Sequence, residues 1–240
     1  MHRRGARLGI ASLAIALAVV AAAAAVTLNY PNFSNVRGLK LNGTAAKAGN
    51  VIRLIETTDS VGTAITKRTV IDPAKSFKTQ FKIRMGGGSF PPGDGMAFAI
   101  HREGRGALGF GGGGMGYGGF DPSIAIEFDI FDNGGEPNPV DNHVGLMLNG
   151  NTGDHVKSGD PGFDLSSTTT HVWIKYSARS KRFKVWVNDA SSRPPGALIS
   201  HRENLKRLLR GKARAGFTAA GGGSSITADV LSWKLKQRTR

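Results

Sequence analysis

Residues 77–83 read FKTQFKI, so that Phe77, Phe81 and Ile83, with Thr79, occupy every second position, and lysine or glutamine stands between them. Residues 183–187 read FKVWV and begin with the same alternation. Successive side chains of a β-strand point to opposite faces of the sheet, and a period of two predicts a strand with one face on the core and one in water. Both stretches therefore predict antiparallel strands.

The rest of the chain extends this pattern. Its 34 glycines and 10 prolines form turn clusters at intervals of about ten residues, and helical periodicity is nearly absent. The expected fold class is all-β, an antiparallel sandwich or barrel, with one short amphipathic helix allowed within residues 202–214. Strands are expected near Gly38–Leu41, Val51–Leu54, Ser76–Arg84, Gly95–His101, Ser123–Phe128, His143–Asn149, His171–Ser177, Arg182–Val187, Ala213–Thr218 and Ala228–Leu235.

Length and composition indicate one folded domain. The chain has 240 residues, of which 40% are hydrophobic and only 20% are charged, and this is enough apolar surface to offset chain entropy. It contains no cysteine, which excludes disulfides, thiolate metal sites and a cysteine nucleophile. Any metal must therefore be held by oxygen and imidazole ligands.

The first 25 residues are predicted to be a signal peptide, followed by one domain over residues 26–240. Arg3, Arg4 and Arg7 form a basic head, an uncharged apolar run follows to residue 25, and residues 23–25 are alanines that suit a signal peptidase. The protein is then secreted or held at the cell surface, with no membrane span after cleavage. An uncleaved anchor is the alternative, because the apolar run just reaches spanning length.

The chain is strongly basic, with a formal net charge of +15, or +12 without the three arginines of residues 1–25. Such a surface attracts polyanions, including anionic polysaccharide. The basic residues cluster at 175–184 and 202–214, and in the second stretch they lack the interleaved aromatic residues typical of single-strand nucleic-acid binding. A solvated basic face is therefore favoured over a specific nucleic-acid site.

The segment from Ile124 to Asn133 carries the most informative chemistry. Glu127 and Asp129 are two apart on a predicted strand, so both carboxylates project from one face, and two like charges this close call for a cation. Carboxylate, carbonyl and amide oxygens suit Ca²⁺, and the His143 imidazole adds a transition-metal ligand. A charged pair on a solvated strand is the plainer interpretation, which the alternating apolar neighbours disfavour.

Three glycine-rich loops, at residues 86–95, 104–119 and 221–223, interrupt the strands. Glycine lets the backbone approach a ligand closely, although the same loops could be simple connections. Asp94 stands between two glycines, where it could accept hydrogen bonds from two sugar hydroxyls or serve only as a turn residue.

Six motifs in a fixed order resemble the legume-type (L-type) lectins, over nearly all of the chain after residue 33. They are GDGMAF at 93–98, LG at 108–109 with GGMGYG at 113–118, IEFDIFDN at 126–133, HVG at 143–145, GFTAAG at 216–221 and DVLSW at 229–233. The resemblance implies a jelly-roll sandwich of the concanavalin-like lectin and glucanase architecture. It also implies a secreted, non-catalytic, metal-dependent carbohydrate-binding protein, which we expect to be of prokaryotic type.

The resemblance also implies a set of site residues, including a cis peptide between Gly93 and Asp94. The carbohydrate-binding residues would be Asp94, Gly113, Gly114, Phe131, Asn133, Gly222, Gly223 and Ser224. The ligands of Ca²⁺ and of a transition metal such as Mn²⁺ would be Glu127, Asp129, Phe131, Asn133, Asn138 and His143. Partners would be glycans or cell-surface polysaccharide, including anionic ones, and a homo-oligomer would raise avidity.

Two departures from the family pattern concern the metals and the last motif. Asn138 stands where the family has a second bridging aspartate, and loss of one anionic ligand should weaken both metal sites, unless Glu136 or Asp141 substitutes. Ala228 stands where a histidine is usual.

Two alternatives remain open at this point. Glu127 and Asp132 imitate the paired carboxylates of a glycoside hydrolase on a related jelly roll, although simple alternation puts them on opposite faces of the strand. The other alternative is an adhesion domain that works through its basic surface. The remaining histidines are expected to be surface or strand residues rather than ligands: His101, His155, His171 and His201.

Overall fold

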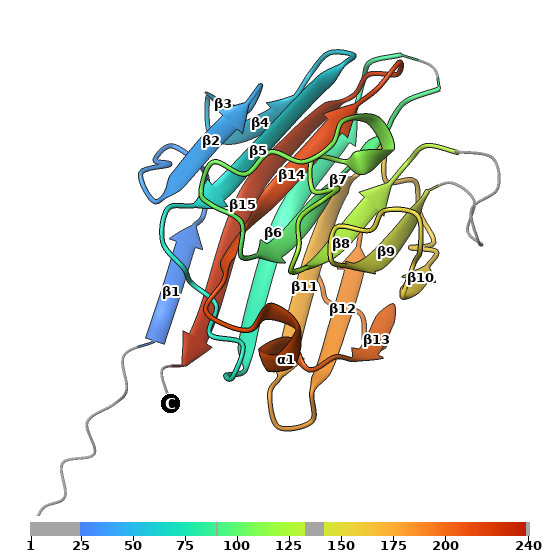
Figure 1. The fold of residues 1–240 in the computed structure, drawn as a ribbon. Helices are drawn as coiled ribbons and strands as arrows, with labels where there is room; N and C mark the ends of the chain where they lie inside the picture. The colour runs from blue at the N-terminus through green and yellow to red at the C-terminus, as the bar shows by residue number, and fades with distance from the viewer. Residues whose placement is uncertain (1–24, 90, 133–141, 239–240) are drawn as a thin grey trace, which may run out of the picture.

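The computed structural model describes residues 25–89, 91–132 and 142–238. Two antiparallel sheets pack face to face with almost no helix, which confirms the expected all-β sandwich (Figure 1). The back sheet has the strand order β13-β12-β11-β6-β15-β4-β3, with β1 paired to β15, and the front sheet has the order β10-β9-β8-β7-β14-β5-β2.

The strands have the following bounds. In the back sheet they are β1 (Ala25–Tyr30), β3 (Ala46–Ala48), β4 (Val51–Ile55), β6 (Phe77–Gly86), β11 (Thr169–Ser177), β12 (Arg182–Asn188), β13 (Ile199–Arg202) and β15 (Thr227–Arg238). In the front sheet they are β2 (Leu39–Gly43), β5 (Ser60–Thr66), β7 (Gly95–His101), β8 (Ser123–Asp129), β9 (His143–Leu148), β10 (Lys157–Gly159) and β14 (Arg214–Gly221).

All ten strands expected from the sequence coincide with observed strands, while β1, β3, β5, β10 and β13 were not expected. The short helix allowed within residues 202–214 is α1 (Leu205–Leu209). The Asn204 side chain caps the N-terminus of α1 by accepting a hydrogen bond from the Arg207 N–H. Leu205 and Leu209 bury the apolar side of this helix. No helix of the described residues is long and apolar enough to cross a bilayer.

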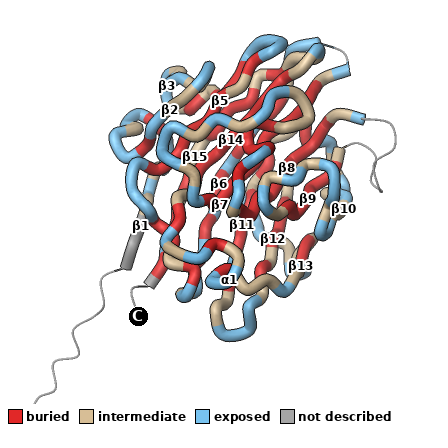
Figure 2. Tube along the Cα trace, viewed as in Figure 1, coloured by how far each residue is buried: buried red, intermediate tan, exposed pale blue. Residues whose placement is uncertain are grey.

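The core lies between the two sheets, where Figure 2 shows the buried positions of the strands. Along β6 buried and exposed residues alternate strictly, as the FKTQFKI stretch predicts. The Phe81 ring lies 5.1 Å from that of Phe98 and 5.0 Å from that of Phe217, and Phe217 lies 5.2 Å from Trp233. Aromatic rings at these separations stabilise the packing of one sheet on the other.

The front sheet is buried on its outer face as well, because the connection between β7 and β8 folds back over it (Figure 1). The Thr218 hydroxyl of β14 donates to the Met115 carbonyl at 2.8 Å, and the Thr63 hydroxyl of β5 donates to the Ala107 carbonyl at 2.8 Å. As a result every residue of β7 and β8 is buried, including the carboxylates of Glu127 and Asp129.

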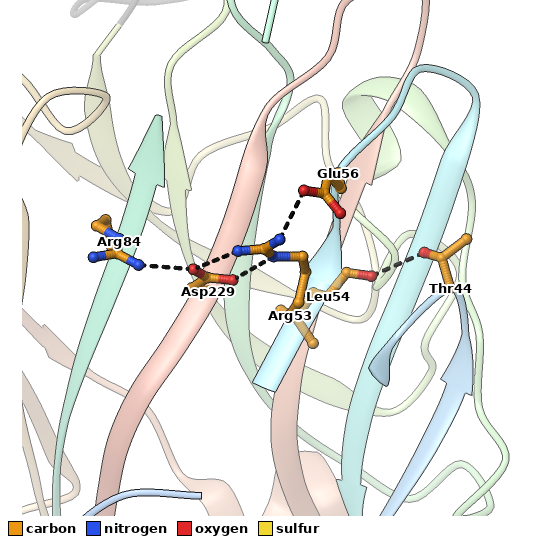
Figure 3. Close-up of polar contacts among 6 residues, drawn as sticks. All are labelled: Thr44, Arg53, Leu54, Glu56, Arg84 and Asp229. Carbon is orange, nitrogen blue, oxygen red and sulfur yellow. Dashed lines mark hydrogen bonds and ion pairs between the residues drawn. The ribbon is translucent and has the colours of Figure 1, made fainter. Parts of the chain in front are cut away.

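In the back sheet a buried carboxylate ties three strands together (Figure 3). Asp229 of β15 is fully buried and accepts hydrogen bonds from Arg53 of β4 at 3.0 Å and from Arg84 of β6 at 3.0 Å. Arg53 also pairs with Glu56 at 2.7 Å. Because both guanidinium groups are partly exposed, water hydrates the cations while they neutralise the buried anion.

Candidate functional site

Asp94 lies directly before β7, at one end of the sandwich, where four loops meet. Its carboxylate Oδ2 accepts a hydrogen bond from the Gly222 N–H at 2.7 Å, although Gly222 belongs to the connection between β14 and β15. The Asp94 carboxyl is mostly buried, and burial raises its pKa above the ordinary value while the Gly222 N–H opposes that rise. The peptide bond between Gly93 and Asp94 is cis, as the family resemblance implies.

Glycines allow this close approach. A Cβ atom added to Gly222 would lie 3.3 Å from both the Asp94 carboxylate and the Gly112 Cα. A Cβ atom on Gly93 would lie 2.6 Å from a ring carbon of Phe131, so that ring packs directly over the Gly93 backbone. The structure therefore brings Asp94, Gly112, Phe131 and Gly222 together from four separate loops.

The other expected carbohydrate-binding residues lie in the 3₁₀ turn after β7, in the loop after β14, or outside the described residues. Gly113 and Gly114 belong to the short 3₁₀ turn η1 (Gly112–Gly114), and the Gly114 N–H donates to the Gly111 carbonyl at 2.9 Å. Gly223 is exposed and Ser224 is half-buried in the loop that Gly222 begins. Asn133 and Asn138 lie outside the described residues, as do the possible substitutes Glu136 and Asp141.

The expected metal ligands Glu127, Asp129 and His143 lie on two paired strands. Asp129 of β8 is the direct cross-strand neighbour of His143 of β9, and Glu127 is opposite Gly145. A Cβ atom on Gly145 would lie only 2.4 Å from Glu127 Oε1, so only glycine leaves room there for the carboxylate. The Asp129 carboxylate accepts the Phe131 N–H at 2.8 Å, which links this centre to the loop beside Asp94.

His155, which the sequence analysis placed among surface or strand residues, belongs to this centre. It lies in the connection between β9 and β10, and its Nε2 atom is 2.6 Å from Glu127 Oε1 and 2.7 Å from His143 Nε2. His143 Nε2 lies 3.6 Å from the same carboxylate oxygen. The prediction for His155 is therefore wrong: its imidazole is 5% exposed and completes a cluster with Glu127 and His143.

Hydrogen bonding sets the charge state of Glu127. Burial disfavours its charged form, but hydrogen bonds from His143, His155 and Tyr117 outweigh burial and lower the pKa of Glu127. The Tyr117 hydroxyl donates to Glu127 Oε2, and burial together with this negative charge raises the pKa of Tyr117 well above its usual value.

This donor set fits a divalent transition-metal ion. Two imidazole nitrogens and a carboxylate oxygen converge within 4.8 Å of one another, and Nδ1 of His143 is buried without a hydrogen-bond partner among the described residues. Imidazole and carboxylate ligands suit zinc, iron, nickel or manganese, whereas Ca²⁺ takes oxygen ligands. A cation here would replace the contact between two imidazole nitrogens, one of which must otherwise carry a proton.

The hydrolase alternative does not fit this geometry. Glu127 is fully buried, accepts a hydrogen bond from the Tyr117 hydroxyl and lies against the two histidines, whereas Asp132 is exposed beyond the end of β8. A retaining hydrolase needs both carboxyl groups about 5–5.5 Å apart at the substrate. Since Glu127 has no access to solvent, it cannot serve as a nucleophile for a polysaccharide.

Comparisons with known proteins agree with the resemblance. The family model described as the legume lectin domain matches residues 25–240. The L-type lectin-domain containing receptor kinase S.7 of Oryza sativa subsp. japonica is 30% identical over 77% of this chain, which spans only 28% of the length of that kinase.

Solved lectin structures share the fold. The lectin from Bauhinia forficata in complex with GalNAc has a TM-score of 0.76 at 23% identity, over 90% of this chain and 100% of that one. The basic winged bean lectin with Tn-antigen has a TM-score of 0.76 at 27% identity, over 89% of this chain and 98% of that one. These relatives are plant proteins and give no support to the expectation of a prokaryotic type.

Proposed function

We propose that this chain, which belongs to the legume lectin family, binds sugar at the loops around Asp94 and depends on metal ions beside them. Carbohydrate binding without catalysis is the function of the family, and the residue roles, the ions and the sugar class are our proposal. The observation that carries it is the hydrogen bond from the Gly222 N–H to Asp94, beside Gly112 and the Phe131 ring.

Each loop contributes one type of contact to a pyranose. The Asp94 carboxylate accepts hydrogen bonds from two sugar hydroxyls, Gly113 and Gly114 present backbone to the ring, and the Phe131 ring packs on its apolar face. Asn133 would bridge sugar and calcium, and the loop of Gly222, Gly223 and Ser224 would set specificity. Each neutral hydrogen bond adds only about 0.5–1.5 kcal/mol, so monovalent affinity should be weak and a homo-oligomer would strengthen binding through avidity.

Two ions would hold these loops in place. Asp129, Asn133 and the Phe131 carbonyl supply oxygen ligands for Ca²⁺, and Glu127, Asp129 and His143 supply ligands for a transition metal such as Mn²⁺. We include His155 in the transition-metal set, because its Nε2 atom points at both Glu127 and His143. It would compensate for Asn138, which cannot provide the anionic oxygen of an aspartate.

The direct test is glycan binding with and without metal. GalNAc and methyl-α-galactoside are suitable first probes, because similar lectins have been solved with GalNAc or galactose. We expect calorimetry with Ca²⁺ and Mn²⁺ present to detect binding of one of them, and exhaustive dialysis against EDTA to abolish it. Full binding after chelation would refute the metal requirement, and an unresponsive glycan array in metal-replete buffer would refute the sugar site.

We also propose that the protein is exported, with residues 1–25 as the signal peptide. The proposal is supported by strand β1, which begins at Ala25, the last residue of the predicted signal peptide. Expression with a secretion system followed by N-terminal sequencing tests this: a mature start at Val26 supports cleavage, and recovery of the intact chain in the membrane fraction supports an anchor.

A further inference from the structure

Four lysines form a straight row across the outer face of the back sheet. Lys184 of β12 is the direct cross-strand neighbour of Lys175 of β11, which is opposite Lys78 of β6, which is opposite Lys236 of β15. The residues on either side of Lys78 are buried in the core, so this row points away from the front sheet. We call these four residues the lysine row.

The lysine row carries an electrostatic cost. Side chains directly opposite one another on antiparallel strands have Cβ atoms about 4.5–5.5 Å apart, and like charges in that position are destabilising. Neighbouring strands are about 4.8 Å apart, so the four charges span about 14 Å. The ion pairs found among the described residues include none of the four lysines. A multivalent anion would relieve this repulsion.

A groove of about 430 Å³ runs beside the row. Trp186 and Trp173 are cross-strand neighbours, each two residues from the lysine of its own strand. Both line the groove together with Arg193 and Lys234, and none of the described acidic residues lines it. The Arg193 guanidinium lies 4.5 Å from the centre of the Trp186 ring. The Trp186 indole N–H is buried and has no hydrogen-bond partner in the described part of the chain, so it is a donor left for a ligand oxygen.

We propose that the lysine row and this groove bind an anionic polysaccharide, with sulfate or carboxylate groups on the lysine ammonium groups and sugar rings along the edges of the two tryptophans, because Arg193 and His171 cover ring faces. Evenly spaced point charges suit a linear chain of anionic sugars, and mobile lysine ammonium groups bind such groups without requiring bidentate geometry. This site goes beyond the proposed sugar site, because it lies on the outer face of the back sheet and uses no residue of the loops around Asp94.

The same observations disfavour two other occupants. Single-stranded nucleic acid needs free aromatic faces for base stacking, but Arg193 covers Trp186, and the His171 ring stacks on Trp173 with centroids 6.1 Å apart and planes 17° apart. A second copy of this chain on a two-fold axis would place one lysine row against another. Both remain outcomes that the experiment distinguishes.

The test compares dextran sulfate with neutral dextran of equal length, by calorimetry at several salt concentrations. The groove variant is Lys78→Gln, Lys175→Gln and Lys236→Gln together. Its matched control removes the same charge elsewhere, as Lys40→Gln, Lys67→Gln and Lys206→Gln, all exposed and outside the groove. We expect dextran sulfate alone to bind, the groove variant to lose about 10- to 100-fold in affinity, and the control to lose less than about 3-fold.

Other results would overturn the proposal. Equal losses in both triple variants would assign binding to net charge, and tighter binding of an oligo(dT) probe than of dextran sulfate would assign the groove to nucleic acid. A dimer of the unliganded protein that the groove variant strengthens would assign it to self-association. Loss of dextran sulfate binding in Asp94→Ala would show that the polysaccharide binds at the sugar site and not at the groove.

Thermal unfolding checks that the variants are folded. We expect the groove variant to be at least as stable as the parent protein, because it removes like-charge repulsion.

Discussion

Glu127 Oε1 lies 2.6 Å from His155 Nε2, although the two residues are separated by a strand and two connections along the chain. This contact adds a second imidazole to the carboxylate and histidine that the sequence had already suggested. The cluster therefore offers three donors among the described residues, one carboxylate and two imidazoles.

Replacement of His155 by alanine should weaken transition-metal binding. Loss of an outer-shell partner typically costs about 10- to 100-fold in metal affinity, so loss of a direct ligand should cost at least this much. Calorimetric titration of the chelated protein with Zn²⁺ and with Mn²⁺ measures it, and elemental analysis gives the stoichiometry. Zn²⁺ should lose more affinity than Mn²⁺, because imidazole is the better ligand for zinc.

The control for this experiment is His201→Ala, which removes an imidazole from β13, in the back sheet. Metal affinity should be unchanged in this variant. If His155→Ala binds both metals as tightly as the parent chain, His155 is a neighbour of the centre and not a ligand.

Replacement of Asp94 by alanine should abolish detectable glycan binding while the fold persists. A hydrogen bond to a charged group is worth about 1.5–3 kcal/mol, so its loss corresponds to about 10- to 100-fold in affinity. The matched control is Asp160→Ala, which removes an exposed carboxylate that accepts a local N–H, from Gly162. A glycan array and the unfolding temperature together check this. Unchanged binding by Asp94→Ala would move the sugar site elsewhere.

The sequence predicted most strands because alternation is a local signal, and β6 shows it in full. It did not predict β5, whose residues Ser60–Thr66 are buried on both faces, one by the core and one by the segment that Thr63 binds. A strand covered on both sides has no polar face, and so no period of two to detect. Strands β7 and β8 are also covered on both sides, but they contain the apolar runs MAFAI and IAI, which SVGTAIT lacks.

The candidate site, like the strands, could be predicted from the sequence only where its residues carry a local signal. Glu127 and Asp129 follow from strand periodicity, and Asp94 from its motif. His155 has no such signal, because it lies in a connection where side-chain direction follows no period, and only the fold brings it to Glu127. Likewise, neither alternation nor composition shows that four lysines of four strands align. That depends on the strand registers, which local sequence does not specify.

Replacement of Asp229 by asparagine should lower the free energy of unfolding by about 1–3 kcal/mol. The fully buried carboxylate loses three charged hydrogen bonds, two from Arg53 and one from Arg84, but these arginines are 30% and 52% exposed and are rehydrated. The loss is therefore smaller than the about 3–5 kcal/mol typical of a fully buried pair. Urea unfolding measures it, with Arg84→Gln as the milder comparison. An Arg84→Gln effect larger than that of Asp229→Asn would contradict this account.

His101 should make the protein less stable in mild acid. It is fully buried at the end of β7, packs on Phe120 with ring centroids 4.6 Å apart, and neither ring nitrogen has a hydrogen-bond partner in the described structure. Burial, together with the positive charge of Arg214, lowers the pKa of His101 from 6.5 to about 4. The folded protein therefore keeps this ring neutral at a pH where the unfolded chain protonates it.

The sign of the effect follows from proton linkage. Between pH 6.5 and about 4 the unfolded chain binds more protons at this position, so the free energy of unfolding falls as the pH falls, by up to about 3 kcal/mol. Above pH 6.5 the contribution is constant. Urea unfolding at pH 7.5, 6, 5 and 4.5 should show that His101→Phe loses less stability on acidification than the parent chain, whereas His201→Gln behaves like the parent. Parallel pH profiles for the parent and His101→Phe would mean that the acid sensitivity arises elsewhere, because removal of the buried imidazole would then have left the proton balance between the folded and unfolded states unchanged.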